Sequence, residues 1–99
     1  MDAPVIEHAD TKRRYEIRIG RDRIGYAQYH DDGNHRTFMH TTIEPDYQGH
    51  GLSSQLIAYA LADTKSSGMR ISAYCPTVAA YLERHHDFDD IVDPVGTMD

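Results

Sequence analysis

The chain has a single cysteine, no long hydrophobic run and no excess of basic residues, and each absence excludes a class of protein. Cys75 has no partner for an internal disulfide. No apolar stretch approaches the ~18 residues that a membrane-spanning helix needs. The N-terminal Met1-Asp2-Ala3-Pro4 carries neither the basic flank nor the apolar stretch of a secretory signal. We therefore expect a cytoplasmic protein that does not bind membranes.

The net charge of the chain limits which classes of binding partner are expected. A formal charge of −6 argues against nucleic-acid binding, because displacing counterions from phosphates needs a basic surface. An acidic surface suits a cationic partner, such as a protein that presents an amine. The length of 99 residues predicts one domain over 1–99, because two buried cores do not fit in so short a chain.

The first half of the chain has the pattern of an antiparallel β-meander. Residues 15–19 alternate apolar and charged side chains, which is typical of a half-buried strand. A turn over 20–23 leads to a second strand over 24–30, and Asp-Asp-Gly-Asn at 31–34 is a hairpin signal before a third strand over 36–43. Simple alternation along that strand places Phe38, His40 and Thr42 on one face and Met39, Thr41 and Ile43 on the other. Residues 1–10 form either a mobile or an edge segment.

The second half changes to a helical pattern. Apolar residues recur at helical spacing from Leu52 to Thr64, and Ser-Ser-Gly at 66–68 ends that helix. A short strand follows over 69–73, and Pro76 begins a second helix that runs to about residue 85. Residues 87–93 form an acidic, solvated end with room for one more short strand, and 93–99 form a tail. The predicted class is α+β: a meander followed by helix–strand–helix.

The loop Gln48-Gly49-His50-Gly51 lies between a strand and the long helix, where a phosphate-binding site is expected. Its glycines let backbone N–H groups approach a ligand, and the helix N-terminus adds unpaired donors and a positive dipole end. It is not a Walker loop, because the Gly-Lys-Ser/Thr ending is absent, and Ser54 replaces the third glycine of a dinucleotide fingerprint. The structural alternative is a glycine-rich helix entry without a ligand.

The segment Ile43 to Ser53, Ile-Glu-Pro-Asp-Tyr-Gln-Gly-His-Gly-Leu-Ser, resembles the GNAT acetyltransferase motif. The core of that motif is Gln/Arg-x-x-Gly-x-Gly/Ala, and the chain departs from it at Ser53, where a small apolar residue is usual. The strand over 38–42 and the segment 75–85 are similar to those of very short, single-domain members of this superfamily. The three segments occur in the same order and cover about residues 13–92. The resemblance implies a minimal GNAT-like fold that lacks the N-terminal helices.

The resemblance also implies acetyl-CoA as cofactor and assigns its binding residues. Thr42 and Ile43 pair with the pantetheine arm, and the thioester lies between their strand and the one that ends at Cys75. Tyr81 is also assigned to cofactor binding, and it lies near, but out of register with, the position of the tyrosine acid of larger members, which Glu83 occupies. Ser54 lies near the pyrophosphate. The pyrophosphate itself is held by the backbone amides of the loop and the helix start, which are those of Gln48, Gly49, His50, Gly51, Leu52 and Ser53.

Cys75 and His40 are the candidate catalytic residues. Cys75 precedes Pro76 at a helix N-terminus, where the dipole lowers a thiol pKa, so its thiolate is able to accept and pass on an acetyl group. The alternative is a buried cysteine that only lines the pantetheine channel. His40 lies on the strand beside the thioester and is a candidate base, because an imidazole ordinarily titrates near neutrality; the alternative is that it simply covers the sheet. No histidine spacing matches a metal site.

The function predicted first is transfer of acetyl from acetyl-CoA to a primary amine. Larger relatives place helices between their first two strands, whereas here only 20–23 join those strands, which predicts an open acceptor site suited to a protein side chain or terminus. The second candidate is an acyl-CoA-binding module without efficient catalysis, and the third is an interaction domain without cofactor. The sequence does not set the oligomeric state.

Overall fold

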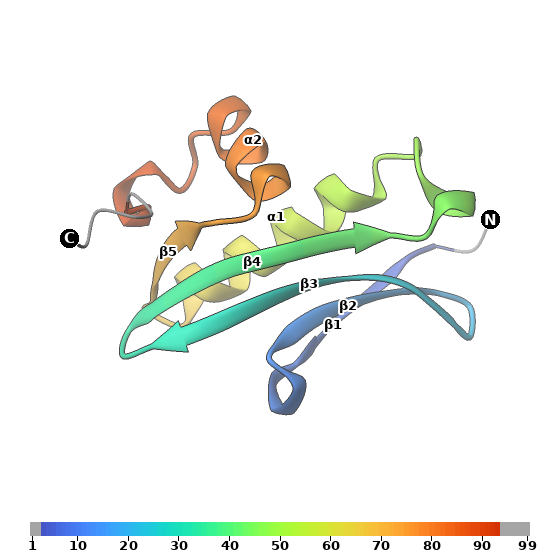
Figure 1. Ribbon diagram of the computed structural model, residues 1–99, viewed down its shortest axis with the longest axis horizontal. Coiled ribbons are helices and arrows are strands. Elements are labelled where there is room, and N and C mark those ends of the chain that lie inside the picture. The colour runs from blue at the N-terminus through green and yellow to red at the C-terminus, as the bar shows by residue number, and fades with distance from the viewer. Residues whose placement is uncertain (1–2, 94–99) are drawn as a thin grey trace.

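The computed structural model describes residues 3–93 and contains one five-stranded sheet with two α-helices (Figure 1). The strands are β1 (Val5–Ala9), β2 (Arg14–Ile19), β3 (Asp22–Asp32), β4 (His35–Ile43) and β5 (Arg70–Ala73). The helices are α1 (Leu52–Ser66) and α2 (Pro76–Arg84), and three short 3₁₀ turns are η1 (Asp10–Lys12), η2 (Pro45–Tyr47) and η3 (Asp89–Ile91). The predicted meander followed by helix–strand–helix is confirmed.

The strands lie in the order β1-β2-β3-β4-β5, with antiparallel pairing up to β4 and parallel pairing between β4 and β5. A parallel pair cannot be joined by a hairpin, so the chain crosses back through α1 between β4 and β5. Beyond the register Phe38↔Ala73 the two strands are no longer paired. This divergence positions the candidate site.

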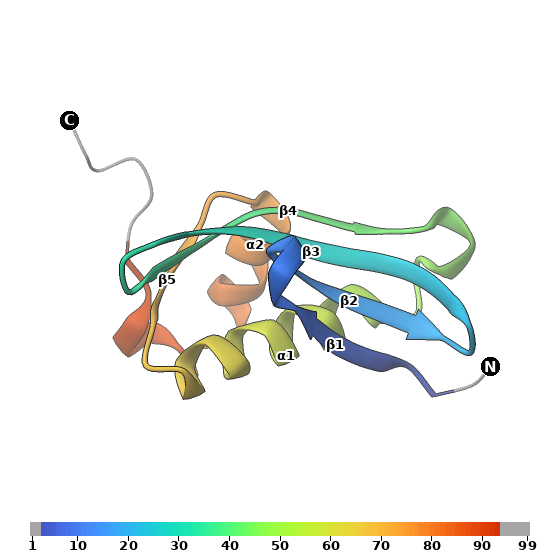
Figure 2. The same ribbon diagram turned by 90° about the horizontal axis from the view of Figure 1, so that it is seen from below.

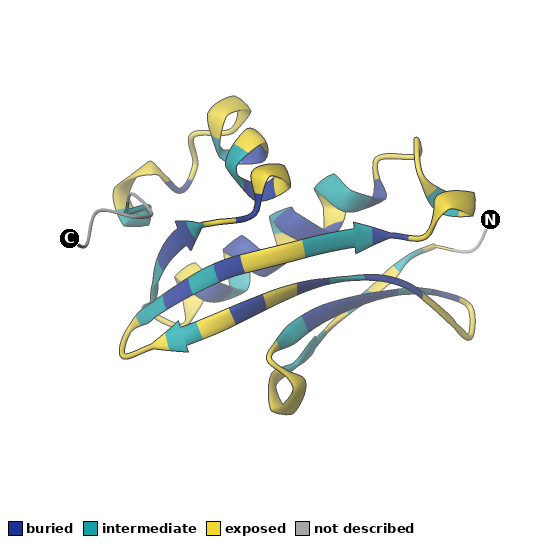
Figure 3. Cartoon of the chain, in the orientation of Figure 1, coloured by how far each residue is buried: buried dark blue, intermediate teal, exposed yellow. Residues whose placement is uncertain are grey.

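The sheet curves over α1, whose apolar side forms the centre of the core (Figure 2). Burial follows one side of each helix, whereas β2 contains three consecutive buried residues over 15–17, as Figure 3 shows. In α2, Val78 and Tyr81 are buried and belong to the same core. The buried residues of α1 recur every three or four positions, as expected for a helix packed on one side: Leu52, Leu56, Ile57, Ala60, Leu61 and Thr64. Among residues 3–93 no helix is long and apolar enough to cross a membrane.

The N-terminal segment is the edge strand of the sheet. β1 pairs along its whole length with β2, from Val5↔Arg18 to Ala9↔Arg14. The expectation that residues 20–23 join the first two strands is therefore wrong, since those strands are β1 and β2 and η1 joins them. Of the two alternatives expected for residues 1–10, the structure shows the edge segment for Val5–Ala9, although Val-Ile-Glu-His-Ala alternates only weakly. The connection is still too short for any helix longer than one turn.

A β-bulge in β4 overturns the predicted faces of that strand. Gln28 pairs with His40, but Tyr29 pairs with Phe38, so Met39 is the extra residue. The alternation therefore shifts by one: Phe38 is buried, Met39 and His40 are both exposed, and Ile43 is buried again. Phe38, Thr41 and Ile43 share the core face, whereas His40 and Thr42 share the outer face.

The C-terminal acidic segment packs against the sheet instead of being fully solvated. Its expected short strand is a single parallel bridge between Val92 and Ile71 that follows η3. Arg70 donates to both carboxylate oxygens of Asp93, at 2.6 and 2.8 Å. The predicted tail beyond Asp93 lies outside the described residues.

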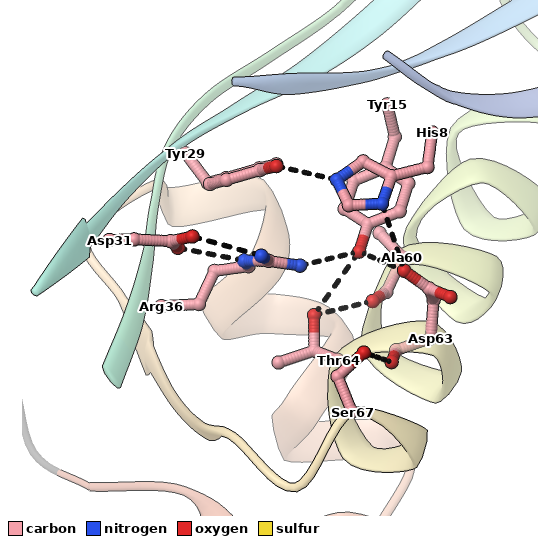
Figure 4. A network of polar contacts seen from close by, with 9 residues as sticks. All are labelled: His8, Tyr15, Tyr29, Asp31, Arg36, Ala60, Asp63, Thr64 and Ser67. Atoms are coloured by element: carbon pink, nitrogen blue, oxygen red, sulfur yellow. Dashed lines mark hydrogen bonds and ion pairs between the residues drawn. The ribbon is translucent and has the colours of Figure 1, made fainter. Parts of the chain in front are cut away.

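A polar network ties four strands to α1 on the core side of the sheet (Figure 4). The Tyr15 hydroxyl donates to Asp63 at 2.6 Å and accepts from Arg36 at 2.8 Å, while Arg36 also forms a two-bond ion pair with Asp31. His8 of β1 contacts both Tyr29 and Asp63. Since buried polar groups are costly unless paired, this network fixes β1 and β2 against the helix.

Candidate active site

A cavity of about 260 Å³ opens where β4 and β5 diverge. The backbone amides of Tyr74 and Cys75 both donate to the carbonyl of Phe38, and the end of β4 beyond Phe38 has no β5 neighbour. The cavity is lined by the end of β4, the loop after it, the start of α1 and one residue of α2: Thr41, Thr42, Ile43, Tyr47, Gln48, Gly49, Gly51, Leu52, Ser53 and Thr77.

The loop between β4 and α1 depends on two glycines with positive φ. Gly49 has φ of 84° and Gly51, the N-cap of α1, has φ of 73°, a conformation that favours glycine. A Cβ atom at either position would meet nothing within 4 Å, so backbone conformation and not space requires glycine here. The Gln48 side chain fixes the loop to β4 by donating from Nε2 to the carbonyl of Ile43 at 2.9 Å.

The start of α1 supplies free backbone donors at the cavity. The first bond of the helix runs from the Gln55 amide to the Gly51 carbonyl, at 3.2 Å. The amides of Leu52 and Ser53, which line the cavity, therefore have no acceptor within the helix, and no side chain caps this end. With the helix dipole added, this end of the cavity suits a phosphate or pyrophosphate group.

The cavity contains most, but not all, of the residues expected to bind the cofactor. Thr42, Ile43 and five residues from Gln48 to Ser53 line it, whereas His50, Ser54 and Tyr81 are not among the lining residues. The sequence reasoning missed Thr41, Tyr47 and Thr77. Tyr47 lies inside the motif segment and could have been included. The bulge hid Thr41 in the strand before the motif, and only the fold brings Thr77 across from α2.

Cys75 lies at the N-cap of α2 and is only 3% exposed. Its Sγ donates to the hydroxyl of Thr41 at 3.6 Å. Burial raises the pKa of the Cys75 thiol, but hydrogen bonds from Thr41 and from the Thr77 and Val78 amides lower it below its ordinary value. The thiol is thus adjacent to two cavity residues, Thr41 and Thr77, without lining the cavity itself.

His40 lies on the outer face of the sheet, away from Cys75. It is exposed, its ring centroid is 6.0 Å from that of Tyr26, and the bulge separates it from the core face where Thr41 meets Cys75. The two candidate catalytic residues therefore do not form a Cys-His pair. His40 neighbours Thr42 along β4 and is open to a reactant that approaches from solvent.

Tyr81 is buried and Glu83 is exposed. The Tyr81 ring stacks on His85, with centroids 4.2 Å apart. Tyr81 belongs to the hydrophobic core, on the buried side of α2, whereas Glu83 faces solvent.

Comparison with known proteins agrees with this geometry. The model of the GCN5-related N-acetyltransferase family matches residues 14–91. The chain belongs to this family. It is an acyltransferase of the GNAT superfamily, whose members generally use acetyl-CoA. The search of curated proteins gave no match.

Three solved structures share the fold at 18% identity or less. A GCN5-like protein of Staphylococcus aureus, solved by NMR, matches with a TM-score of 0.70 and 18% identity, covering 95% of this chain and 92% of that one. An IAA acetyltransferase of Bacillus cereus matches with a TM-score of 0.63 and 16% identity, covering 83% and 75%. The ribosomal-protein-S18-alanine N-acetyltransferase of Escherichia coli has a TM-score of 0.63 and 16% identity, covering 74% of this chain and 52% of its own length. The alignment thus spans only about half of the length of the last of these.

Proposed function

We propose that this GNAT protein transfers the acetyl group of acetyl-CoA to a primary amine of a polypeptide. The observation that carries the proposal is the N-terminus of α1 opening onto the cavity at the divergence of β4 and β5. It offers free amides for the pyrophosphate of the donor and, beside them, unpaired strand backbone for an extended arm.

The donor is held by backbone rather than by basic side chains. The amides from Gln48 to Ser53 bind the pyrophosphate, and the backbone of Thr41–Ile43 pairs with pantetheine. No Lys or Arg lines the cavity, so helix and loop amides supply the positive potential. Because the cavity volume is only about 260 Å³, we expect the adenine of the donor to lie outside it.

Cys75 is proposed as the group that accepts the acetyl. Its thiolate attacks the thioester carbonyl, the C–S bond to CoA breaks, and the CoA thiolate leaves and takes up a proton. The amine then attacks the acetyl-cysteine, loses a proton and releases the thiol. The lowered pKa of Cys75 and its contact with Thr41 beside the cavity support this role, and its burial is the main argument for the alternative of a packing residue.

His40 is proposed as the base that removes the proton of the incoming amine. It is exposed on the same outer face as Thr42, on the strand that borders the cavity. An imidazole has an ordinary pKa near 6.5, which suits proton transfer close to neutrality. A variant His40→Gln is expected to lower kcat/KM and to leave the affinity for CoA unchanged.

An open acceptor side favours a polypeptide acceptor. Met39 and Tyr74, at the divergence of the strands, are 43% and 64% exposed, and His40 lies exposed next to Met39. The described connection before β2 is only η1, so no helices wall this side. The similar Escherichia coli enzyme, named for an alanine of ribosomal protein S18, is an example of the fold acting on a protein.

Two measurements test the proposal. Calorimetric titration with CoA tests the donor site, and intact-mass spectrometry after incubation with acetyl-CoA tests the cysteine. A hydroxylamine-labile gain of about 42 Da in the wild type, missing in Cys75→Ala, supports the two-step route. Turnover without an adduct, and retained in Cys75→Ala, replaces it with direct transfer. CoA binding without turnover on any amine leaves the binding-module function, and no CoA binding refutes the proposed function.

A further inference from the structure

The basic residues of this acidic chain are concentrated in one segment. Residues 12–23 contain six basic and two acidic side chains, a net charge of +4, whereas the rest of the chain contains four basic and fourteen acidic ones, a net charge of −10. The segment spans the end of η1, all of β2 and the turn into β3. The charge is therefore distributed very unevenly along the chain, which the net charge of −6 does not reveal.

Four of these cations surround one buried carboxylate on the outer face of the sheet. Glu16 is 3% exposed and lies within 4 Å of each of them. Burial raises the pKa of Glu16, but the hydrogen bonds and charges of its neighbours, led by Arg14, lower it below its ordinary value, so it remains ionised. We call the four basic side chains the cationic face: Lys12, Arg14, Arg18 and Arg23.

One carboxylate cannot neutralise four cations. Arg18 and Arg23 are direct cross-strand partners, an arrangement of like charges that is unfavourable by itself. Glu16 accepts one hydrogen bond from each of them, both at 3.3 Å, and Glu7 accepts a second from Arg18. Each guanidinium has five N–H donors, and Arg14, Arg18 and Arg23 together use four of their fifteen in side-chain hydrogen bonds among the described residues. Glu16 thus orients the groups and leaves their capacity to bind a further anion.

The pairing register connects the cationic face with the proposed acceptor side. Arg14 pairs with Gln28, which pairs with His40, so these three lie in one row across β2, β3 and β4. Glu16 pairs with Tyr26 and Tyr26 with Thr42 in the next row. The guanidinium of Arg14 lies 5.1 Å from the Tyr26 ring centre, which keeps it over the sheet. A chain that presents an amine at His40 therefore extends over the cationic face.

We propose that the cationic face selects acceptor polypeptides that carry several acidic side chains next to the acetylated amine. This inference rests on the proposed function and names its substrate class. Carboxylates on the acceptor meet the free guanidinium donors, while the negative remainder of the molecule repels the same acceptor elsewhere, so it docks in one orientation. The preference for a cationic partner expected from the net charge is thereby reversed at this surface.

The test uses fluorescein-labelled peptides with one lysine flanked on each side by three aspartates or three serines. Fluorescence anisotropy measures binding without acetyl-CoA, and acetylation kinetics follow with acetyl-CoA present. We expect the aspartate peptide to bind at least about tenfold more tightly than the serine peptide, equivalent to about 1.4 kcal/mol. Added salt should weaken its binding, because the contacts are exposed to solvent.

Matched variants locate the effect. Arg23→Gln should remove much of the preference for the aspartate peptide. Arg84→Gln, at an exposed position of α2, changes the net charge equally and should retain that preference. Equal binding of aspartate and serine peptides, or equal losses in both variants, would overturn the proposal. Anisotropy needs no catalysis, so the two proposals can fail separately. Selective binding without acetylation supports this inference and counts against the proposed function. Acetylation without selective binding supports the proposed function and counts against this inference.

Discussion

The side-chain amide of Gln48 donates to the backbone carbonyl of Ile43 at 2.9 Å and so joins the cofactor loop to the end of β4. Both residues line the cavity. The bond holds the two elements that meet the pyrophosphate and the pantetheine arm of the proposed donor. Gln48 therefore has a positioning role through its side chain, in addition to any contact that its amide makes.

Removal of this bond is expected to weaken donor binding more than folding. Gln48→Ala loses one partly exposed hydrogen bond of about 0.5–1.5 kcal/mol, so the Kd for CoA should rise by up to about tenfold. Calorimetry measures the Kd, and Gln55→Ala, on an exposed position of α1, is the control. An unchanged Kd in Gln48→Ala would show that the loop holds its position without the bond.

Alanine at Gly51 is expected to strain the N-cap of α1. A side chain at positive φ costs about 1–2 kcal/mol. Gly33→Ala is a matched control, because Gly33 has φ of 61° in the β3–β4 turn and its Cβ would also meet nothing within 4 Å. Both variants should lose similar stability to urea, but only Gly51→Ala should raise the Kd for CoA. Equal Kd values for CoA in Gly51→Ala and Gly33→Ala would show that the conformation at Gly51 does not affect CoA binding.

The hydroxyl of Thr41 is expected to help lower the pKa of Cys75. Thr41→Val keeps the shape of the side chain and removes the hydrogen bond to Sγ. The rate of modification by methyl methanethiosulfonate follows the thiolate fraction, so its pH midpoint should lie below that of free cysteine in the wild type and should rise in Thr41→Val. Thr42→Val, on the outer face, should leave the midpoint in place.

The hydroxyl of Tyr15 is expected to stabilise the fold in a pH-dependent way. Tyr15→Phe removes one hydrogen bond from Asp63 and one from Arg36, which keep, among the described residues, only their polar contacts with His8 and Asp31, at a cost of about 1–3 kcal/mol at pH 7. Burial, followed by the hydrogen bond to Asp63, raises the pKa of Tyr15 above the ordinary value of about 10.

The raised pKa sets the pH window of this effect. In the unfolded chain Tyr15 ionises near pH 10, so its contribution is complete below that pH and decreases as pH rises toward the folded pKa. Urea unfolding at pH 7 and pH 11 should show a smaller difference between wild type and Tyr15→Phe at the higher pH. The exposed Tyr74→Phe serves as control. A difference that grows with pH would contradict the assignment.

Local patterns in the sequence were sufficient for most elements. The hairpin at 31–34, the helical spacing of α1 and Pro76 at the start of α2 each act over a few residues, and the structure places those elements within about two residues of the prediction. The glycine loop was found for the same reason, since Gly49 and Gly51 adopt a backbone conformation that other residues avoid.

Long-range pairing was not readable in the same way. The bulge at Met39 depends on how β4 aligns with β3, and it moved His40 to the outer face and Thr41 toward Cys75. β1 is a strand because Val5–Ala9 has β2 to pair with, although its own alternation is weak.

The sequence by itself determined the class of fold, the family and the glycine loop before α1, because these depend on periodicity and on residues adjacent in the chain. Only the tertiary structure decided that Thr77 joins the cavity, that Cys75 and His40 lie on different faces, and that four cations gather around Glu16. The physical reason is register. The first two relationships join segments that are distant in the chain, and the third depends on the register of β2 with β3. A shift of one residue in a strand exchanges its two faces.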